Sequence, residues 1–171
     1  QGSPAKASFH WQKPESNKGL WRLFQNKRYR EILVFSPFVN SRIVSRFKDI
    51  SGSFALVGNR DNLSQKLEPG HFCPESELLY FTELDIEQDH SPHTDEKNNS
   101  MEPAITDYLH SKAYFLQRED GAIEIVIGSA NCTHSGLEGT NTEAVVKLVM
   151  QDLSVADILD QFVYAPREDG D

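Results

Sequence analysis

Three short segments in the C-terminal half carry side chains that could act together on a phosphate ester. They are His110-Ser111-Lys112, Gly128-Ser129-Ala130-Asn131 and Asn141-Thr142-Glu143. Lys112 and Asn131 could bind the non-bridging oxygens of a phosphodiester and stabilise the charge that develops in the transition state. His110 could attack phosphorus, and Glu143 could accept a hydrogen bond from one of its ring nitrogens and so fix the tautomer. No cluster with metal-ligand spacing accompanies this set, so we expect a reaction that uses neither a metal ion nor a cofactor.

Strand geometry explains how these segments could meet. In a strand, residues two apart point to the same face, so His110 and Lys112 would project side by side. The runs 108–117 and 122–127 are joined by Glu119-Asp120-Gly121, which is typical of a hairpin turn. The hairpin would return Ser129 and Asn131 to the edge that carries His110. A further strand over 143–150 would bring Glu143 to the same place.

The rest of the chain alternates strand-like and helix-like segments, which predicts an α/β domain with a central mixed sheet flanked by helices. We expect further strands over 31–39, 53–58 and 77–84, and helices over 19–28, 40–49, 61–67 and 155–163. Asn40 or Ser41 is a suitable N-cap for the second of these helices. We predict a single domain over 9–165 with a polar loop at about 85–103. Residues 1–8 are interpreted as a cloning remnant or a disordered segment, and 166–171 as a disordered tail.

Composition and charge limit the possible partners. The chain has 171 residues, 38% of them hydrophobic, and no apolar run approaches the roughly 20 residues of a membrane span, so we expect no stable membrane association. Its two cysteines favour a reducing, cytoplasmic location. The net charge of −9 is unevenly distributed, because residues 1–48 hold ten Lys or Arg against two Glu. The net charge therefore does not exclude a nucleic-acid partner, because the local electrostatic field of the protein steers association. The acidic stretch 83–102 is interpreted as a solvated loop, with a regulatory flap as the alternative.

The motifs resemble those of the phospholipase D superfamily, whose pattern is His-x-Lys-x4-Asp followed by Gly-Ser-x-Asn. The similarity extends over most of 30–163, including Ser36-Pro37-Phe38, and is specific only over 110–143. It implies a phospholipase D-like layered fold in which His110 is the nucleophile or the general acid. It further implies that Lys112 and Asn131 bind phosphate, that Ser129 supports the site and that Glu143 orients the histidine.

The chain departs from this pattern in two respects. Four residues separate Lys112 from Gln117, so Gln117 stands in place of the superfamily's Asp, and Asp120 in the turn is a poor replacement. The tyrosyl-DNA phosphodiesterase branch also lacks this Asp. Only one motif is present, whereas superfamily sites are built from two. The resemblance therefore implies a symmetric homodimer, or pairing with a second motif from a longer chain.

Three functions fit these residues. The first is a metal-independent nuclease of bacterial type, acting on DNA in preference to RNA through a covalent phosphohistidine, with Arg28, Arg30 and Arg42 on backbone phosphates. The second is a phospholipid-hydrolysing or transferring enzyme, against which the lack of an amphipathic basic helix argues. The third is a non-catalytic module that binds nucleic acid or dimerises. Trp11 and Trp21 could stack on bases, or pack against the core or a dimer partner.

Overall fold

The hairpin that the sequence predicts lies near the middle of the sheet. A computed structural model describes residues 6–14, 19–58, 76–81, 110–161 and 164–166. Strands β5 (Ala113–Gln117) and β6 (Ile123–Gly128) are antiparallel, with Ala113 opposite Ile127. The turn closes with the Arg118 amide donating to the Ala122 carbonyl at 2.8 Å, and Gly121 adopts φ +86°, which a glycine tolerates.

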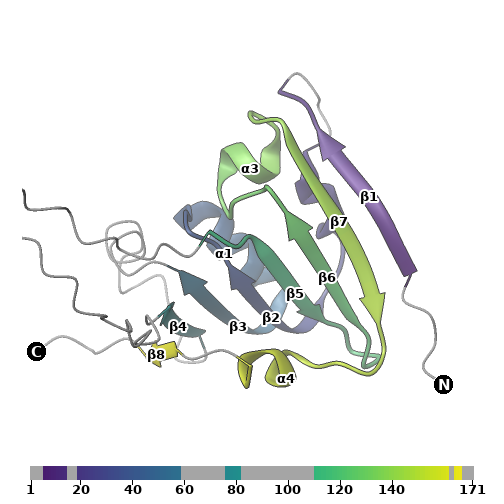
Figure 1. Ribbon diagram of the computed structural model, residues 1–171, viewed down its shortest axis with the longest axis vertical. Coiled ribbons are helices and arrows are strands. Elements are labelled where there is room, and N and C mark those ends of the chain that lie inside the picture. The colour runs from purple at the N-terminus through teal and green to yellow at the C-terminus, as the bar shows by residue number, and fades with distance from the viewer. Residues whose placement is uncertain (1–5, 15–18, 59–75, 82–109, 162–163, 167–171) are drawn as a thin grey trace, which may run out of the picture.

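Six further strands extend the hairpin into one mixed sheet (Figure 1). β7 (Glu143–Met150) pairs with β6, and β1 (Lys6–Gln12) pairs with β7, both antiparallel. On the other side, β2 (Tyr29–Phe35) is antiparallel to β5, and β3 (Ser51–Gly58) and β4 (Ser76–Phe81) continue parallel to it. β8 (Tyr164–Pro166) closes the far edge, giving the order β1-β7-β6-β5-β2-β3-β4-β8. The prediction of a central mixed sheet flanked by helices is confirmed.

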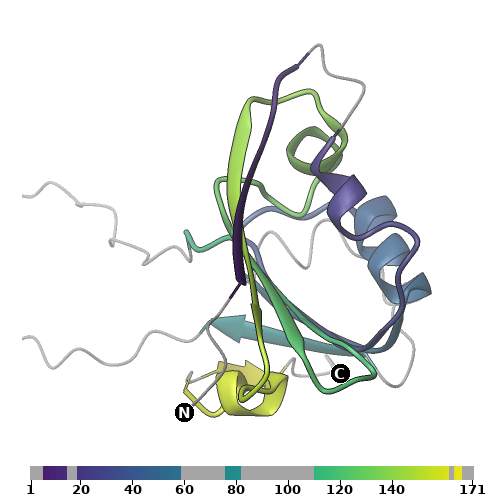
Figure 2. The same cartoon turned by 90° about the vertical axis from the view of Figure 1, so that its right-hand side faces the viewer.

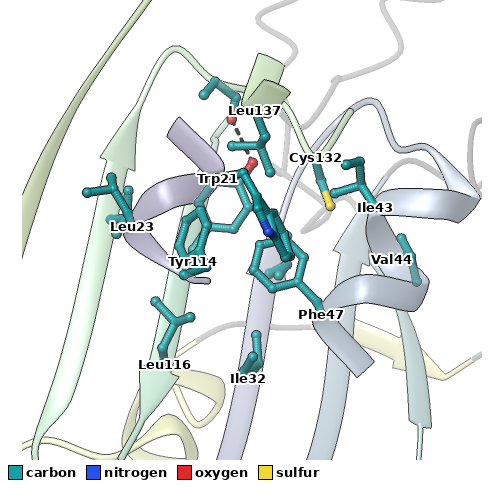
Figure 3. Packing of buried hydrophobic residues seen from close by; sticks show 14 of the residues in the cluster. Trp21, Leu23, Ile32, Ile43, Val44, Phe47, Tyr114, Leu116, Cys132 and Leu137 are labelled. Atoms are coloured by element: carbon teal, nitrogen blue, oxygen red, sulfur yellow. Dashed lines mark hydrogen bonds between the residues drawn. The ribbon is translucent and has the colours of Figure 1, made fainter. Parts of the chain in front are cut away.

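Helices cover both faces of this sheet (Figure 2). The 3₁₀ helix η1 (Leu20–Leu23), α1 (Ser41–Asp49) and α3 (His134–Glu138) lie on one face, and α4 (Val155–Leu159) lies on the other. The first face buries a cluster of aromatic rings in which Phe47 contacts Trp21 and Tyr114 (Figure 3). The Phe24 ring contacts all three of these rings. Trp21 therefore packs in the core, which is one of the alternatives considered for this side chain, and does not stack on a base.

Helix α1 begins where the sequence predicts. The Asn40 side chain accepts hydrogen bonds from the amides of Arg42 at 3.1 Å and Ile43 at 3.4 Å, so Asn40 is the N-cap. Ile43, Val44 and Phe47 then face the core on successive turns. This fixes the direction in which the chain leaves the end of β2.

Several predicted boundaries differ from the structure. Residues 6–8 belong to β1, so the interpretation of this segment as disordered is wrong. The helix predicted over 19–28 is only the short η1, because Asn26 adopts φ 60° and turns the chain toward β2. Helix α4 stops at Leu159. The helix predicted over 61–67 and the polar loop at 85–103 lie outside the described residues. No helix in the described part of the chain is long and apolar enough to cross a membrane.

Candidate active site

The predicted site residues come from the ends of three adjacent strands. The Gly128 amide, at the end of β6, donates to the carbonyl of Lys112, just before β5, at 3.2 Å. The next amide, that of Ser129, donates to the Ala144 carbonyl in β7 at 3.0 Å. The pairing of β5, β6 and β7 thus brings Lys112, Ser129 and Glu143 to one edge of the sheet.

The Glu143 carboxylate is the buried anchor of this edge. Its side chain accepts a short hydrogen bond from the Ser129 hydroxyl on one oxygen, and one from the Asn141 amide at 3.1 Å on the other. The Ser129 hydroxyl in turn accepts from the Ala144 amide at 3.1 Å. Glu143 is only 6% exposed. Among the described residues, the partners of Glu143 are Ser129 and Asn141, so the expected hydrogen bond to His110 is not made here.

Glycines allow the backbone to pack tightly around the site. A Cβ atom at Gly128 would overlap the Ala144 carbonyl oxygen and the Val145 backbone, so no other residue fits there without a shift of β6 against β7. A Cβ at Gly136 in α3 would approach the Asn131 carbonyl oxygen to 2.5 Å. The glycine of the Gly-Ser-x-Asn segment therefore permits the close strand contact that presents Ser129 to Glu143.

The His110 and Lys112 side chains lie on the segment that leads into β5. The strand begins at Ala113, so these two residues are outside the ladder, contrary to the expectation that they lie within a strand. His110 is exposed, Lys112 is half-buried, and the Lys112 ammonium donates to the His110 carbonyl at 2.8 Å. The His110 side chain is thus accessible from solvent.

Asn131 lies on the loop between β6 and α3 with an unused acceptor. Its side-chain Oδ1 is buried and has no hydrogen-bond partner within the described part of the chain. The Asn131 carbonyl accepts from the Thr133 amide at 2.8 Å, and the Tyr114 hydroxyl donates to the preceding carbonyl, of Ala130, at 2.8 Å (Figure 3). The backbone of this loop is therefore held from both sides.

The same loop is tied to the end of β2. The Ser36 hydroxyl accepts from the Cys132 amide at 2.9 Å and donates to the Phe38 carbonyl at 2.7 Å, while the Asn40 amide donates to the Cys132 carbonyl at 2.9 Å. Cys132 is fully buried, and burial raises the pKa of its thiol. It is a core residue rather than a reactive one. No group of three or more His, Cys, Asp or Glu side chains in the described ranges is placed to hold a metal ion.

Comparison with known proteins identifies this architecture. No protein-family model and no curated protein sequence matches the chain. Solved structures do: Nuc from Salmonella typhimurium, a phospholipase D family member, aligns with TM-score 0.52 and 13% identity over 92% of this chain and 91% of its own. NucT from Helicobacter pylori aligns with TM-score 0.51 and 15% identity over the same shares. Yeast tyrosyl-DNA phosphodiesterase aligns with TM-score 0.57 and 15% identity over 85% of this chain.

The chain has the phospholipase D fold. It spans about a third of the yeast enzyme's chain (32%) but nearly the whole of Nuc and NucT. The fold places the five predicted residues His110, Lys112, Ser129, Asn131 and Glu143 in one region of this sheet edge, on or beside the ends of β5, β6 and β7.

Gln117 does not belong to this edge of the phospholipase D fold. It lies at the far end of β5, where it is 2% exposed. Its amide donates to the Gly121 carbonyl at 2.8 Å, and its side-chain oxygen accepts from the Val155 amide at 3.3 Å. Gln117 thus holds the hairpin turn and the start of α4, and its role is in the fold.

The predicted nucleic-acid contacts divide between the two ends of β2. Arg42 is exposed on the first turn of α1, close to Asn40 and the site loop. Arg28 and Arg30 are exposed at the beginning of β2. Because a strand rises about 3.3 Å per residue, they lie roughly 20 Å from the Ser36 end. The structure therefore groups only Arg42 with the candidate site.

Gln12 is a positioning residue that the sequence prediction missed. It is 1% exposed at the end of β1, and its amide donates to the Gly136 carbonyl at 2.9 Å, while its oxygen accepts from the Leu20 amide at 2.8 Å. Gln12 also lies opposite Glu143 in the sheet. The alternation of Ala7, Phe9 and Trp11 is the pattern that could have revealed this strand.

Proposed function

We propose that the protein is a metal-independent phosphodiesterase that cleaves nucleic acid, DNA in preference to RNA, through a covalent phosphohistidine. The observation that carries the proposal is the exposed His110 beside Lys112 at the sheet edge where Glu143 anchors Ser129. Similarity of fold to Nuc, NucT and tyrosyl-DNA phosphodiesterase supports the choice of substrate class.

The proposed reaction has two steps. One ring nitrogen of His110 attacks phosphorus, a P–N bond forms, and the P–O bond to the leaving group breaks as that oxygen takes a proton from a second acid. Water then gives a proton to the conjugate base of the second acid, attacks phosphorus and breaks the P–N bond, which regenerates His110. Lys112 and the Asn131 amide stabilise the charge on the non-bridging oxygens, where preorganised donors contribute most. Ser129 and Glu143 keep the β6 end of the site in place.

The second acid is proposed to be His110 of another copy of the motif, most simply in a homodimer. The sheet face opposite η1 exposes an apolar row across three strands, in which Phe9 lies opposite Val146, and Val146 lies opposite Ile127. These side chains are 66%, 41% and 47% exposed, and Trp11 beside them is 52% exposed. The row ends next to Ala144 and Ser129, so a second copy covering it would approach the site.

Cleavage of labelled single-stranded and duplex DNA in excess EDTA tests the activity. We expect the wild type to cleave, and His110→Ala to lose about three orders of magnitude in rate while keeping its unfolding free energy. An acid-labile phosphate label on the wild type would support the covalent step. Loss of cleavage on chelation, or full activity of His110→Ala, would contradict the proposal. Parallel assays with RNA, and of choline release from phosphatidylcholine vesicles, decide between substrate classes.

Sedimentation tests the dimer. We expect Val146→Asp, which puts a charge in the apolar row, to be monomeric and to lose cleavage. Gln25→Asp adds the same charge at an exposed position on the other side of the sheet and should sediment as the wild type does. A wild type that is monomeric yet fully active would contradict the shared site.

A further inference from the structure

Cationic side chains collect in a second place, away from His110. A hollow of about 300 Å³ lies on the η1-covered side of β1 and β7. The side chains that matter for its chemistry are Lys6, Ser8, His10, Arg22, Lys27 and Lys147. None of them belongs to the candidate active site, and the hollow has no part in the reaction proposed above.

Strand pairing and η1 together explain why these side chains converge. Ser8 lies opposite Lys147, and His10 lies opposite Val145, so alternate residues of β1 and β7 face the same side of the sheet. Arg22 comes from the last turn of η1, and Lys27 from the connection between η1 and β2. Segments distant in sequence thus contribute one cation each to a common surface.

In the described part of the chain, the Glu124 carboxylate pairs with two of these cations. Glu124 accepts from the ammonium groups of Lys147 at 2.6 Å and Lys27 at 2.9 Å, and from the Tyr29 hydroxyl at 3.1 Å. Within the described residues, the ion pairs of both lysines use this single carboxylate. Lys6 and Arg22 add two more cations to the same hollow.

The cations are close enough to affect one another. Burial lowers the pKa of Lys147, and Lys27 beside it lowers it further, against the opposing effect of Glu124. The pKa of His10 is lowered by burial and then by Arg22, Lys147 and Lys27. The His10 ring is also within 2.8 Å of the Ser8 hydroxyl. A compact multivalent anion in this hollow would reduce the repulsion and find ammonium, guanidinium and hydroxyl donors together.

We propose that this hollow is a second phosphate-binding site, which holds a phosphate group of the nucleic-acid strand at a distance from the one being cleaved. That the ligand is a nucleic acid rests on the proposed function. That the hollow binds phosphate rests only on the cationic and hydroxyl groups that line it. Lys147 is four residues along β7 from Glu143, about 13 Å at the rise of a strand. Along the axis of a DNA duplex, where each base step rises roughly 3.4 Å, that distance corresponds to about four base steps.

The first experiment follows the His10 ring by NMR during a titration with inorganic phosphate, at ionic strength held constant with chloride. It uses His110→Ala, so that the signals of the His110 ring at the candidate active site do not overlap those of His10. We expect saturable shifts of the His10 signals and a rise of the His10 pKa toward its ordinary value. Absence of a saturable change would overturn the site.

Matched variants locate the binding. Lys6→Gln with Arg22→Gln removes two cations but keeps the contacts of Glu124 with Lys27 and Lys147, and should weaken phosphate binding about tenfold or more. Lys13→Gln with Lys48→Gln removes two cations outside the hollow and should leave binding unchanged. An equal decrease in affinity in the two double variants would overturn the assignment to this hollow.

The second experiment identifies the source of the phosphate with a single-stranded DNA oligonucleotide. In the His110→Ala background, Lys6→Gln with Arg22→Gln should weaken oligonucleotide binding. It should also lower the salt dependence of the affinity by about 0.7 in log–log slope for each phosphate that the variant no longer neutralises. Phosphate binding at His10 with unchanged oligonucleotide affinity would overturn the nucleic-acid assignment. A wild type that cleaves nothing would contradict the proposed function, while the phosphate titration would still decide the hollow.

Discussion

The two halves of the candidate site are built in different ways. On the β6–β7 half, Ser129, Asn141 and Glu143 form a hydrogen-bonded group at the paired ends of two strands, and Gly128 allows the close contact that holds it. On the other half, His110 and Lys112 precede β5, and their described contacts are one ammonium–carbonyl hydrogen bond and one backbone bond to Gly128. The proposed positioning groups are thus hydrogen-bonded at the ends of β6 and β7, while the proposed reacting groups lie on the approach to β5. The first half should affect folding, and the second should affect only catalysis.

Lys112→Met should separate the two halves most sharply. Loss of the ammonium removes stabilisation of the transition-state charge, so we expect the cleavage rate to fall about 10² to 10³-fold. The free energy of unfolding should change by less than about 0.5 kcal/mol, because the side chain lies outside the ladder. Single-turnover cleavage and urea unfolding measure the two effects. A large loss of stability would show that the His110–Lys112 segment is as integral to the fold as β6 and β7.

Gly128→Ala should show the opposite behaviour. The added Cβ overlaps the Ala144 carbonyl, so we expect the unfolding free energy to fall by about 2–3 kcal/mol. Chemical denaturation measures it. Gly121→Asn is the control, since that position is open and Asn tolerates its left-handed φ, and it should cost less than about 1 kcal/mol. Equal stability of the two variants would mean that the β6–β7 contact has room to relax.

Ser129→Ala tests whether the Glu143 group couples the two halves. Removing the hydroxyl leaves one oxygen of a buried carboxylate without its donor, so we expect a loss of about 1–2 kcal/mol in unfolding free energy, together with slower cleavage. Ser111→Ala, an exposed serine between His110 and Lys112, should change neither quantity. An unchanged unfolding free energy in Ser129→Ala would show that this hydrogen bond does not stabilise the β6–β7 half of the site.

The smallest effect concerns Glu124, which serves as a reference far from the reacting groups. Burial opposes ionisation of this carboxyl, but hydrogen bonds from Lys147 and Lys27 outweigh burial and hold its pKa below the ordinary value of 4.5. Its contribution to stability is therefore present above that value and lost as the pH falls through the lowered pKa. Unfolding free energies at pH 7 and pH 3 should differ less in Glu124→Gln than in the wild type.

The sequence predicted those parts of the fold that depend on neighbours in the chain. The turn at Gly121, the strand Glu143–Met150 and the cap at Asn40 are local features, and the structure confirms each. It did not predict β1, whose partner β7 is more than a hundred residues away and whose polar and apolar residues alternate only briefly. Nor could it locate Gln12, because a buried glutamine at the end of β1 is recognisable only once its hydrogen bonds to η1 and α3 exist.

Residue types and spacing by themselves led to the chemistry proposed for this protein, since an imidazole, an ammonium and a carboxamide in that order favour phosphate-ester chemistry in any arrangement that gathers them. Tertiary structure decided what each residue does there. In the folded chain the Glu143 carboxylate accepts hydrogen bonds from Ser129 and Asn141, and Gln117 stabilises the hairpin turn. The hollow around Lys147 is formed by strands and a helix that are far apart in sequence. The physical reason is that hydrogen bonds and charge clusters depend on distances in space, and only the pairing of strands sets those distances.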